Sequence, residues 1–380
     1  MTSARGRGSE RSGGPSRGGN AAAAPDAPAP MDAAAAAGPR AAAGGTRSEQ
    51  PVIHMPHSLD EALRIRRDTG AVPIAGGTDY MVQVRPGGHR AGGRPAGGGP
   101  SGGGEERGGS RRGGDILFLT GISELRGVRA EDDGLEGDRG DGDGAGQIAI
   151  GAATTLTDIA GSPACPDSLR EIIRQFASPA IRNSATVGGN ICNASPAADL
   201  LPFFYVHGAT VVLQSSEGSR ELSIRDFITG PGETALRPEE LLREVSFSMA
   251  MAGAPAGSGK AGGEAPAVTF YRKVAARRSN ALSKLSVYIA GGRILEDRLS
   301  AFRAAIGGAA PTVVRLEETE QWICGMTVDE VRRAMPEILE AYGAALAPID
   351  DQRSSARYRR NTALRLLEHA LIRATERNSA

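Results

Sequence analysis

Short apolar runs alternate with amphipathic stretches along most of this chain. An apolar run of a few residues predicts a buried strand, and apolar residues on one helical side predict an amphipathic helix. Ser58 followed by Glu61 predicts a capping box at the first helix. Alternating short strands and helices indicate an α/β or α+β domain. The strands are expected at residues 72–75, 115–119 and 147–150, and the helices at 58–65, 156–159 and 167–177.

The second half of the chain continues this alternation with longer elements. A Gly/Ala-rich break at residues 251–265 predicts a linker between one domain at 50–250 and another at 266–380. The second domain is expected to be a small antiparallel sheet with helices, which makes the whole fold α+β. The expected elements are helices at 199–206, 313–323, 328–335 and 361–374, and strands at 209–214, 220–223, 241–247, 268–274, 285–290 and 303–307.

Two segments, residues 1–49 and 86–114, have a different composition. Gly, Ala, Pro, Ser and Arg dominate them, and such sequences bury too little apolar surface to offset chain entropy. We expect a disordered extension followed later by a Gly-rich insertion. A start at Met31 or Met55 is an alternative interpretation of the extension. Three Arg-Gly-Gly tripeptides lie in these segments, but without interleaved aromatic residues they argue only weakly for RNA contact.

Charge and cysteine content limit the class of protein. Lys+Arg and Asp+Glu both number 44, a balance that argues against a nucleic-acid-binding or membrane-surface protein. The three isolated cysteines cannot build a disulfide scaffold or supply four thiolates to an iron–sulfur cluster. No apolar run approaches the roughly 18 residues of a membrane span, and the histidines form no metal set. We therefore expect a cytoplasmic enzyme with no metal site of its own.

Two Gly-Gly pairs about a hundred residues apart are the main candidates for chemistry. They lie in Pro73-Ile-Ala-Gly-Gly-Thr-Asp-Tyr80 and in the segment Ile181–Asp199. Glycine lets backbone N–H groups approach an anion closely, so two such loops could hold the two phosphates of one dinucleotide. The alternative is two tight turns without a ligand. No G-x-G-x-x-G follows the first predicted strand, and the P-loop motif is absent from the sequence.

These segments resemble the FAD-binding subunits of molybdenum hydroxylases, the xanthine dehydrogenase and carbon monoxide dehydrogenase flavoprotein family. The resemblance rests on Ala75-Gly-Gly-Thr-Asp79 and on Ile181-Arg-Asn-Ser-Ala-Thr-Val-Gly-Gly-Asn-Ile-Cys-Asn-Ala-Ser-Pro-Ala-Ala-Asp199. Four further motifs follow the family order, beginning at Ile150, Thr229, Tyr271 and Gly308. The resemblance implies a two-part FAD-binding domain of α/β subdomains and a small C-terminal antiparallel sheet with helices.

The resemblance also implies a set of FAD-binding residues and no catalytic acid or base. The N–H groups of residues 75–78 and 188–190 are expected to face the pyrophosphate, Asp199 a ribose or adenine donor, and Lys273 the reduced flavin. Ordinary core positions are the alternative for Phe176 and Leu242, and a solvated lysine for Lys273. The expected residues are Pro73, Ile74, Ala75, Gly76, Gly77, Thr78, Asp79, Tyr80, Phe176, Thr186, Val187, Gly188, Gly189, Asn190, Asp199, Leu242 and Lys273.

The function implied by the resemblance is electron transfer within a larger enzyme. Electrons are expected to come from a small [2Fe–2S] subunit, which receives them from a molybdopterin-binding large subunit, and to leave to NAD or another acceptor. Ser279-Asn-Ala-Leu-Ser-Lys-Leu285 resembles the xanthine dehydrogenase type. A self-contained flavin oxidoreductase and a non-enzymatic RNA-binding or assembly protein are the alternatives. Alanine at both Gly76 and Gly189 is expected to abolish FAD retention.

Overall fold

A computed structural model describes residues 51–85, 89–90, 114–131, 146–249, 268–277, 280–295 and 297–375. These residues lie within one compact unit, Gln50–Ala380. The predicted extension at 1–49, most of the insertion at 86–114 and the linker at 251–265 fall outside the described residues.

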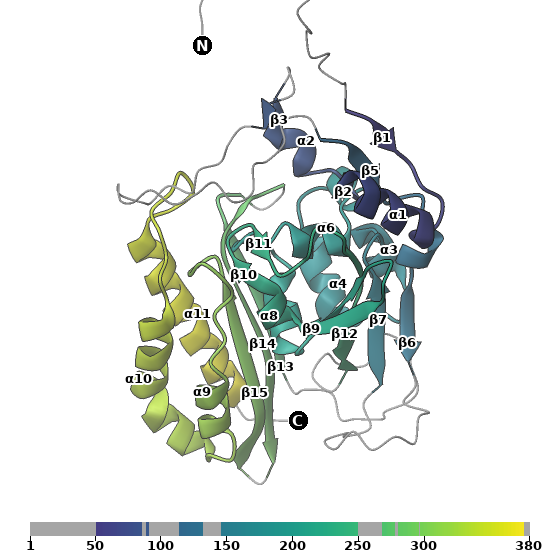
Figure 1. Ribbon diagram of the computed structural model, residues 1–380. Coiled ribbons are helices and arrows are strands. Elements are labelled where there is room, and N and C mark those ends of the chain that lie inside the picture. Colours follow the sequence, from purple (N-terminus) through teal and green to yellow (C-terminus); the bar gives the residue numbers. More distant parts are fainter. Residues whose placement is uncertain are drawn as a thin grey trace, which may run out of the picture. The chain divides into compact units, whose positions relative to one another are not determined.

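The first described part is a three-stranded parallel sheet with one covering helix (Figure 1). Ser58 caps α1 (Leu59–Thr69) by accepting the Glu61 N–H, as predicted. The Glu61 carboxylate, however, accepts from the N–H of His57 and not from Ser58, so the predicted capping box is only half formed. The sheet order is β1 (Ile53–His54), β5 (Ile116–Phe118) and β2 (Val72–Ile74).

A five-stranded antiparallel sheet follows. Its centre is β12 (Leu241–Ser248), which pairs with β7 (Gln147–Gly151) and β8 (Thr210–Gln214). The edges are β6 (Val128–Glu131) and β9 (Ser219–Ser223). The apolar runs predicted β7, β8 and β12, whereas β6 carries no such run and was not predicted.

Short elements connect these strands. Helices α3 (Leu156–Gly161), α4 (Asp167–Arg174), α5 (Pro179–Arg182), α6 (Val187–Cys192), α7 (Leu201–Val206) and α8 (Ile224–Phe227) pack on an apolar core that the five-stranded sheet shares. The other short elements are α2 (Tyr80–Gln83), η1 (Ser123–Leu125), and the strand pairs β3 (Val84–Arg85)–β4 (His89–Arg90) and β10 (Ile228–Gly230)–β11 (Glu233–Thr234). Leu125 of η1 belongs to the core beside the three-stranded sheet.

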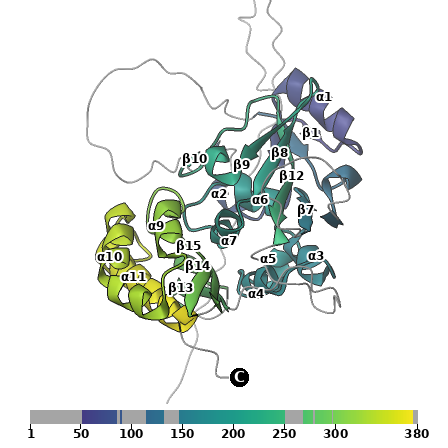
Figure 2. The same ribbon diagram turned by 90° about the horizontal axis from the view of Figure 1, so that it is seen from below.

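The C-terminal part is a three-stranded antiparallel sheet with two covered faces. Its strands are β13 (Val268–Ala275), β14 (Ser283–Leu295) and β15 (Arg298–Gly307), with β14 in the centre. Helices α9 (Glu317–Ile323), α10 (Val328–Ala345) and α11 (Ala356–Thr375) share the apolar core on one face (Figure 1). Helix α7 contacts β14 and β15 from the other side (Figure 2).

The α+β prediction is confirmed, with differences at element ends. Helix α9 begins four residues later than expected, because Val314 pairs with Ile306 as an isolated β-bridge and keeps the preceding chain extended. Helix α10 continues ten residues beyond the expected end, through Pro336, which it accommodates internally.

A buried His207–Tyr288 pair links α7 to the C-terminal sheet. The Nε2 atom of His207 lies 3.0 Å from the Tyr288 hydroxyl, and Phe203 packs against the imidazole. Burial lowers the pKa of His207 to about 3, and the charges of Arg303 and Arg315 act in the same direction. The imidazole therefore stays neutral in the folded chain over the ordinary pH range.

This neutral imidazole predicts a loss of stability in acid. In the unfolded chain the histidine pKa is about 6.5. Below that pH the unfolded state binds a proton at this histidine, whereas the folded state leaves it neutral, so the folded state loses stability relative to the unfolded state. Relative to a His207→Gln variant, the wild type should lose up to about 1.4 kcal/mol of unfolding free energy per pH unit between pH 6 and 4. Denaturant titrations across that range measure the difference, and parallel stability curves for the two proteins would contradict it.

Candidate functional site

The two Gly-Gly segments lie against each other. The first follows β2 as a turn, and the second continues from Ser184 into α6. A Cβ atom at Gly76 would collide with the Ser184 carbonyl and lie 2.9 Å from the Cα of Ala185. Gly76 is thus required where one backbone packs directly on the other.

The first segment keeps its backbone donors available. The N–H groups of Gly76, Gly77 and Thr78 donate to no acceptor within the described residues. Gly77 adopts a left-handed conformation with φ of 65°, and its carbonyl accepts the N–H of Met81 at 2.9 Å. Successive free amides in such a turn form a concavity suited to an anion.

The second segment uses its backbone donors internally. It is the short helix α6 and not a loop, capped by the Thr186 hydroxyl, which accepts the Gly189 N–H at 3.1 Å. The Gly188 N–H donates to Ala152 O at 2.9 Å, and the Asn190 N–H to Thr186 O at 3.0 Å. The expectation that the amides of residues 188–190 face a pyrophosphate therefore does not hold in this structure.

A buried ion pair connects the FAD-directed motifs of the two predicted domains. The Nζ atom of Lys273 lies 2.5 Å from Oδ2 of Asp199, and their side chains are 5% and 9% exposed. Lys273 also donates to the carbonyl of Gln175 at 3.3 Å, and its ammonium lies 6.0 Å from the centre of the Phe176 ring. Phe176, Asp199 and Lys273, predicted separately, thus meet in one place.

This ion pair leaves one donor and one acceptor unused. An ammonium has three N–H donors, and two of those of Lys273 are engaged. The Oδ1 atom of Asp199 is buried and has no hydrogen-bond partner within the described residues. Burial raises the pKa of Asp199, while the positive charge of Lys273 opposes the shift. The arrangement could bind a ligand that carries both donors and acceptors.

The remaining predicted residues divide between core and surface. Leu242 is 4% exposed and pairs with Leu213 inside the five-stranded sheet, so its side chain belongs to the core. Thr186 and Val187 are buried as well, whereas Asn190 is half-buried, and its Oδ1 has no hydrogen-bond partner among the residues that the structure describes. Pro73 and Ile74 form part of β2, Asp79 is exposed, and Ala75 and Tyr80 are half-buried.

Sequence reasoning missed two polar neighbours of the ion pair. Ser283 is close enough to lower the pKa of Asp199, although its hydroxyl donates to the carbonyl of Leu285. Ser286 stands opposite Lys273 in the register of β13 and β14. The period of two along a strand would have indicated Tyr271, which shares a sheet face with Lys273.

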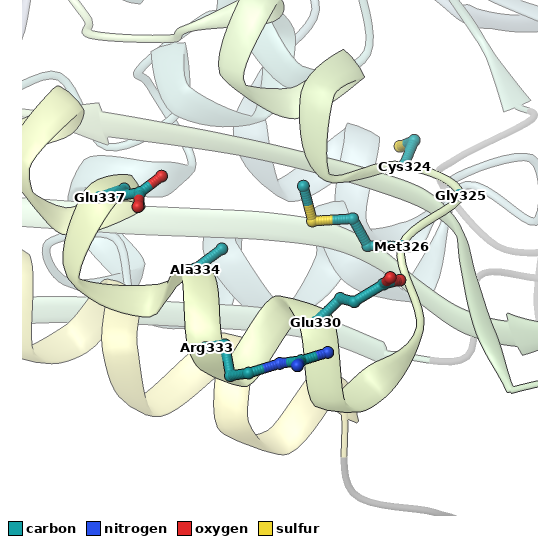
Figure 3. Close-up of a pocket in the computed structure, with 7 residues that line it drawn as sticks. All are labelled: Cys324, Gly325, Met326, Glu330, Arg333, Ala334 and Glu337. Atoms are coloured by element: carbon teal, nitrogen blue, oxygen red, sulfur yellow. The ribbon is translucent and has the colours of Figure 1, made fainter.

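A separate surface concavity of about 540 Å³ lies beside α10 (Figure 3). No predicted site residue lines it, and its Glu330 is already engaged as the capping-box partner of Thr327. Within the described ranges, no group of three His, Cys, Asp or Glu side chains could hold a metal ion. No helix in the described part of the chain is long and apolar enough to cross a membrane. The ion pair and the first glycine turn therefore remain the candidate site. The residues lining the concavity are Cys324, Gly325, Met326, Glu330, Arg333, Ala334 and Glu337.

Comparison with known proteins gives consistent matches. Residues 90–247 match the FAD binding domain in molybdopterin dehydrogenase, and residues 270–374 match the CO dehydrogenase flavoprotein C-terminal domain. The chain is 27% identical to a xanthine dehydrogenase FAD-binding subunit of Escherichia coli O157:H7, over 70% of this chain and 77% of that protein. It is 29% identical to the carbon monoxide dehydrogenase medium chain of Afipia carboxidovorans, over 60% of this chain and 75% of that protein.

A solved structure gives the same fold. One chain of the reconstituted CO dehydrogenase from Oligotropha carboxidovorans superposes with a TM-score of 0.66, covering 87% of this chain and 100% of its own length at 23% identity. At that identity the likeness supports the fold alone.

The two glycine pairs predict unequal responses to alanine. Gly76→Ala forces a Cβ into the Ser184 backbone and should destabilise the cofactor-free chain by about 3 kcal/mol or more, at the top of the overpacking range. Gly189→Ala, where the nearest atom is the Thr186 hydroxyl at 3.0 Å, should change the stability by less than about 1 kcal/mol. Denaturant midpoints of the two single variants test this, and equal losses would refute the packing argument.

Proposed function

Because the chain belongs to the family of FAD-binding flavoprotein subunits of molybdenum hydroxylases, which are subunits of oxidoreductases, we propose that it transfers electrons within an enzyme of xanthine dehydrogenase type. In this proposal the chain accepts electrons from [2Fe–2S] clusters of a small subunit, which a molybdopterin-binding large subunit supplies. It delivers them to NAD or another acceptor. The match to the Escherichia coli subunit covers 70% of this chain, against 60% for the carbon monoxide dehydrogenase medium chain, and this supports the xanthine dehydrogenase type.

The proposal rests on one observation: the hydrogen-bonding groups that remain without a partner in the described residues match the donors and acceptors of a dinucleotide. Three free amides at Gly76, Gly77 and Thr78 suit a pyrophosphate. The free Oδ1 of Asp199 suits a hydroxyl or N–H donor, and the third N–H of Lys273 suits an acceptor. Bound FAD supplies the redox chemistry, and the protein contributes binding, orientation and electrostatics.

Each group has a defined task in the proposed site. A hydrogen bond to a charged group contributes about 1.5–3 kcal/mol, so the three amides of the first turn would offset much of the cost of desolvating the pyrophosphate. Lys273 acts as a hydrogen-bond donor and not as an uncompensated cation, because Asp199 balances its charge. The site therefore orients the cofactor without adding net charge beside it.

The proposal requires partner subunits for the rest of the electron path. The whole chain has three cysteines, fewer than the four thiolates of a [2Fe–2S] cluster. We place the assembly in the cytoplasm, in keeping with the isolated cysteines and balanced charge.

The first test is the visible absorption spectrum of the purified full-length chain, with the released cofactor identified by chromatography. We expect a flavin spectrum and FAD in a one-to-one ratio to the chain. A folded, colourless protein that takes up no added FAD would refute the proposal.

Removing the ion pair should weaken FAD binding selectively. The double variant Lys273→Met/Asp199→Asn leaves neither charge buried alone, and losing the charged contacts should raise the Kd for FAD about tenfold or more. Lys284→Met is the matched control, because Lys284 lies over the ring of Tyr358 and not at the site, and its Kd should stay within about twofold of the wild type. Titration of the flavin-free chain measures both, and equal affinities would refute the role of the pair.

A further inference from the structure

The hydroxyl of Tyr271, beside the ion pair, plays no part in the site described so far. The OH of Tyr271 is buried and has no hydrogen-bond partner within the described residues. Tyr271 lies on β13 two positions before Lys273, so both side chains leave the same face of the sheet. That face packs against the core around the five-stranded sheet.

The neighbouring Tyr288, on the same face of the sheet, has a hydroxyl that does find a hydrogen-bond partner. Tyr288 stands directly opposite Tyr271 in the register of β13 and β14, on the same face. Its hydroxyl reaches Nε2 of His207 at 3.0 Å. The two cross-strand tyrosines therefore differ, because Tyr288 has a hydrogen-bond partner and Tyr271 has none among the described residues.

Other unpartnered polar atoms gather near Tyr271. Seven buried side-chain atoms lack a partner in the described part of the chain, and three of them belong to Tyr271, Asp199 and Ser286. Asp199 binds Lys273, and Ser286 is the register partner of Lys273. A buried polar group without a hydrogen bond is costly, so a cluster of them points to a ligand that satisfies them together.

Tyr271 keeps a proton that it can donate to such a ligand. Burial and the negative charge of Asp199 hold the pKa of Tyr271 well above its ordinary value, so the phenol keeps its proton. Asp199 Oδ1 beside it is an acceptor. A flavin carries both nitrogen and oxygen acceptors and N–H and hydroxyl donors, and it can satisfy both groups.

We propose that the Tyr271 hydroxyl donates a hydrogen bond to an uncharged acceptor of the bound flavin cofactor and fixes its orientation beside Lys273. This inference rests on the proposed function, because it requires that the chain bind FAD. It gives a role to Tyr271, which begins one of the family motifs but was not among the FAD-binding residues expected from the sequence.

The test compares Tyr271→Phe with Tyr288→Phe in the full-length chain stripped of flavin. Tyr271→Phe removes an unpartnered hydroxyl, so the thermal midpoint of the flavin-free chain should stay equal or rise by about 1–3 °C. Its Kd for FAD should increase about three- to tenfold, and the visible band of the bound flavin should shift. Tyr288→Phe should do the opposite, lowering the flavin-free midpoint and leaving the Kd within about twofold of the wild type.

The opposite effects of the two variants on the flavin-free thermal midpoint and on the Kd for FAD distinguish a cofactor-binding hydroxyl from a structural one. A lower flavin-free midpoint for Tyr271→Phe would mean that the hydroxyl is satisfied internally, for example by a buried water, and would overturn the inference. Wild-type affinity for FAD in Tyr271→Phe would overturn it too while leaving the proposed function intact. Failure of the wild type to bind FAD would instead refute the proposed function itself.

Discussion

Burial of strand β14 on both faces is the constraint on which the rest of the structure depends. Leu285, Val287 and Ile289 enter the core under α9–α11, whereas Tyr288 and Ala290 enter the core of the five-stranded sheet. A polar side chain on a strand buried on both sides is costly unless it finds a hydrogen-bond partner. On β14, Tyr288 finds one in His207, whereas the Ser286 hydroxyl has none among the described residues. The candidate ion pair lies beside this hydroxyl, because Lys273 is the register partner of Ser286.

A second buried charged pair, Arg315 and Glu320, lies where α9, β15 and α7 meet, and its polar atoms are hydrogen-bonded. Glu320 is buried and accepts from Arg315 and from the N–H of Ala304. Arg315 also donates to the carbonyl of Tyr205 at 2.8 Å, which ties the start of α9 to α7. Burial raises the pKa of Glu320 while Arg315 opposes that shift. Both carboxylate oxygens of Glu320 accept hydrogen bonds, whereas Oδ1 of Asp199 accepts none from the described residues. This contrast distinguishes a complete structural ion pair from an incomplete one.

The sequence predicted elements whose signal is local and missed those that depend on tertiary contact. The apolar runs of β5 and β12 and the alternation in β14 indicate strands without knowledge of their neighbours. Helix α6 could not be predicted, because its two glycines disfavour a helix, and it forms only where Thr186 caps it and Gly188 packs on Ala152. The family motifs supplied Phe176, Asp199 and Lys273, but not the pairing of Asp199 with Lys273. That pairing joins residues 74 positions apart and exists only once β13 packs beside the segment before α7.

The two Gly-Gly pairs show why a glycine motif alone does not identify a ligand site. Glycine is needed wherever a backbone approaches closely, whether the neighbour is an anion or another stretch of chain. The two cases differ in whether the adjacent N–H groups already donate to an acceptor of the chain. In the second pair they donate to Ala152 and Thr186, and Gly188 serves packing on Ala152, whereas in the first pair they donate to no acceptor in the described chain. In the proposed site, the first turn thus binds the pyrophosphate and the second segment supports that turn through the backbone contact between Gly76 and Ser184.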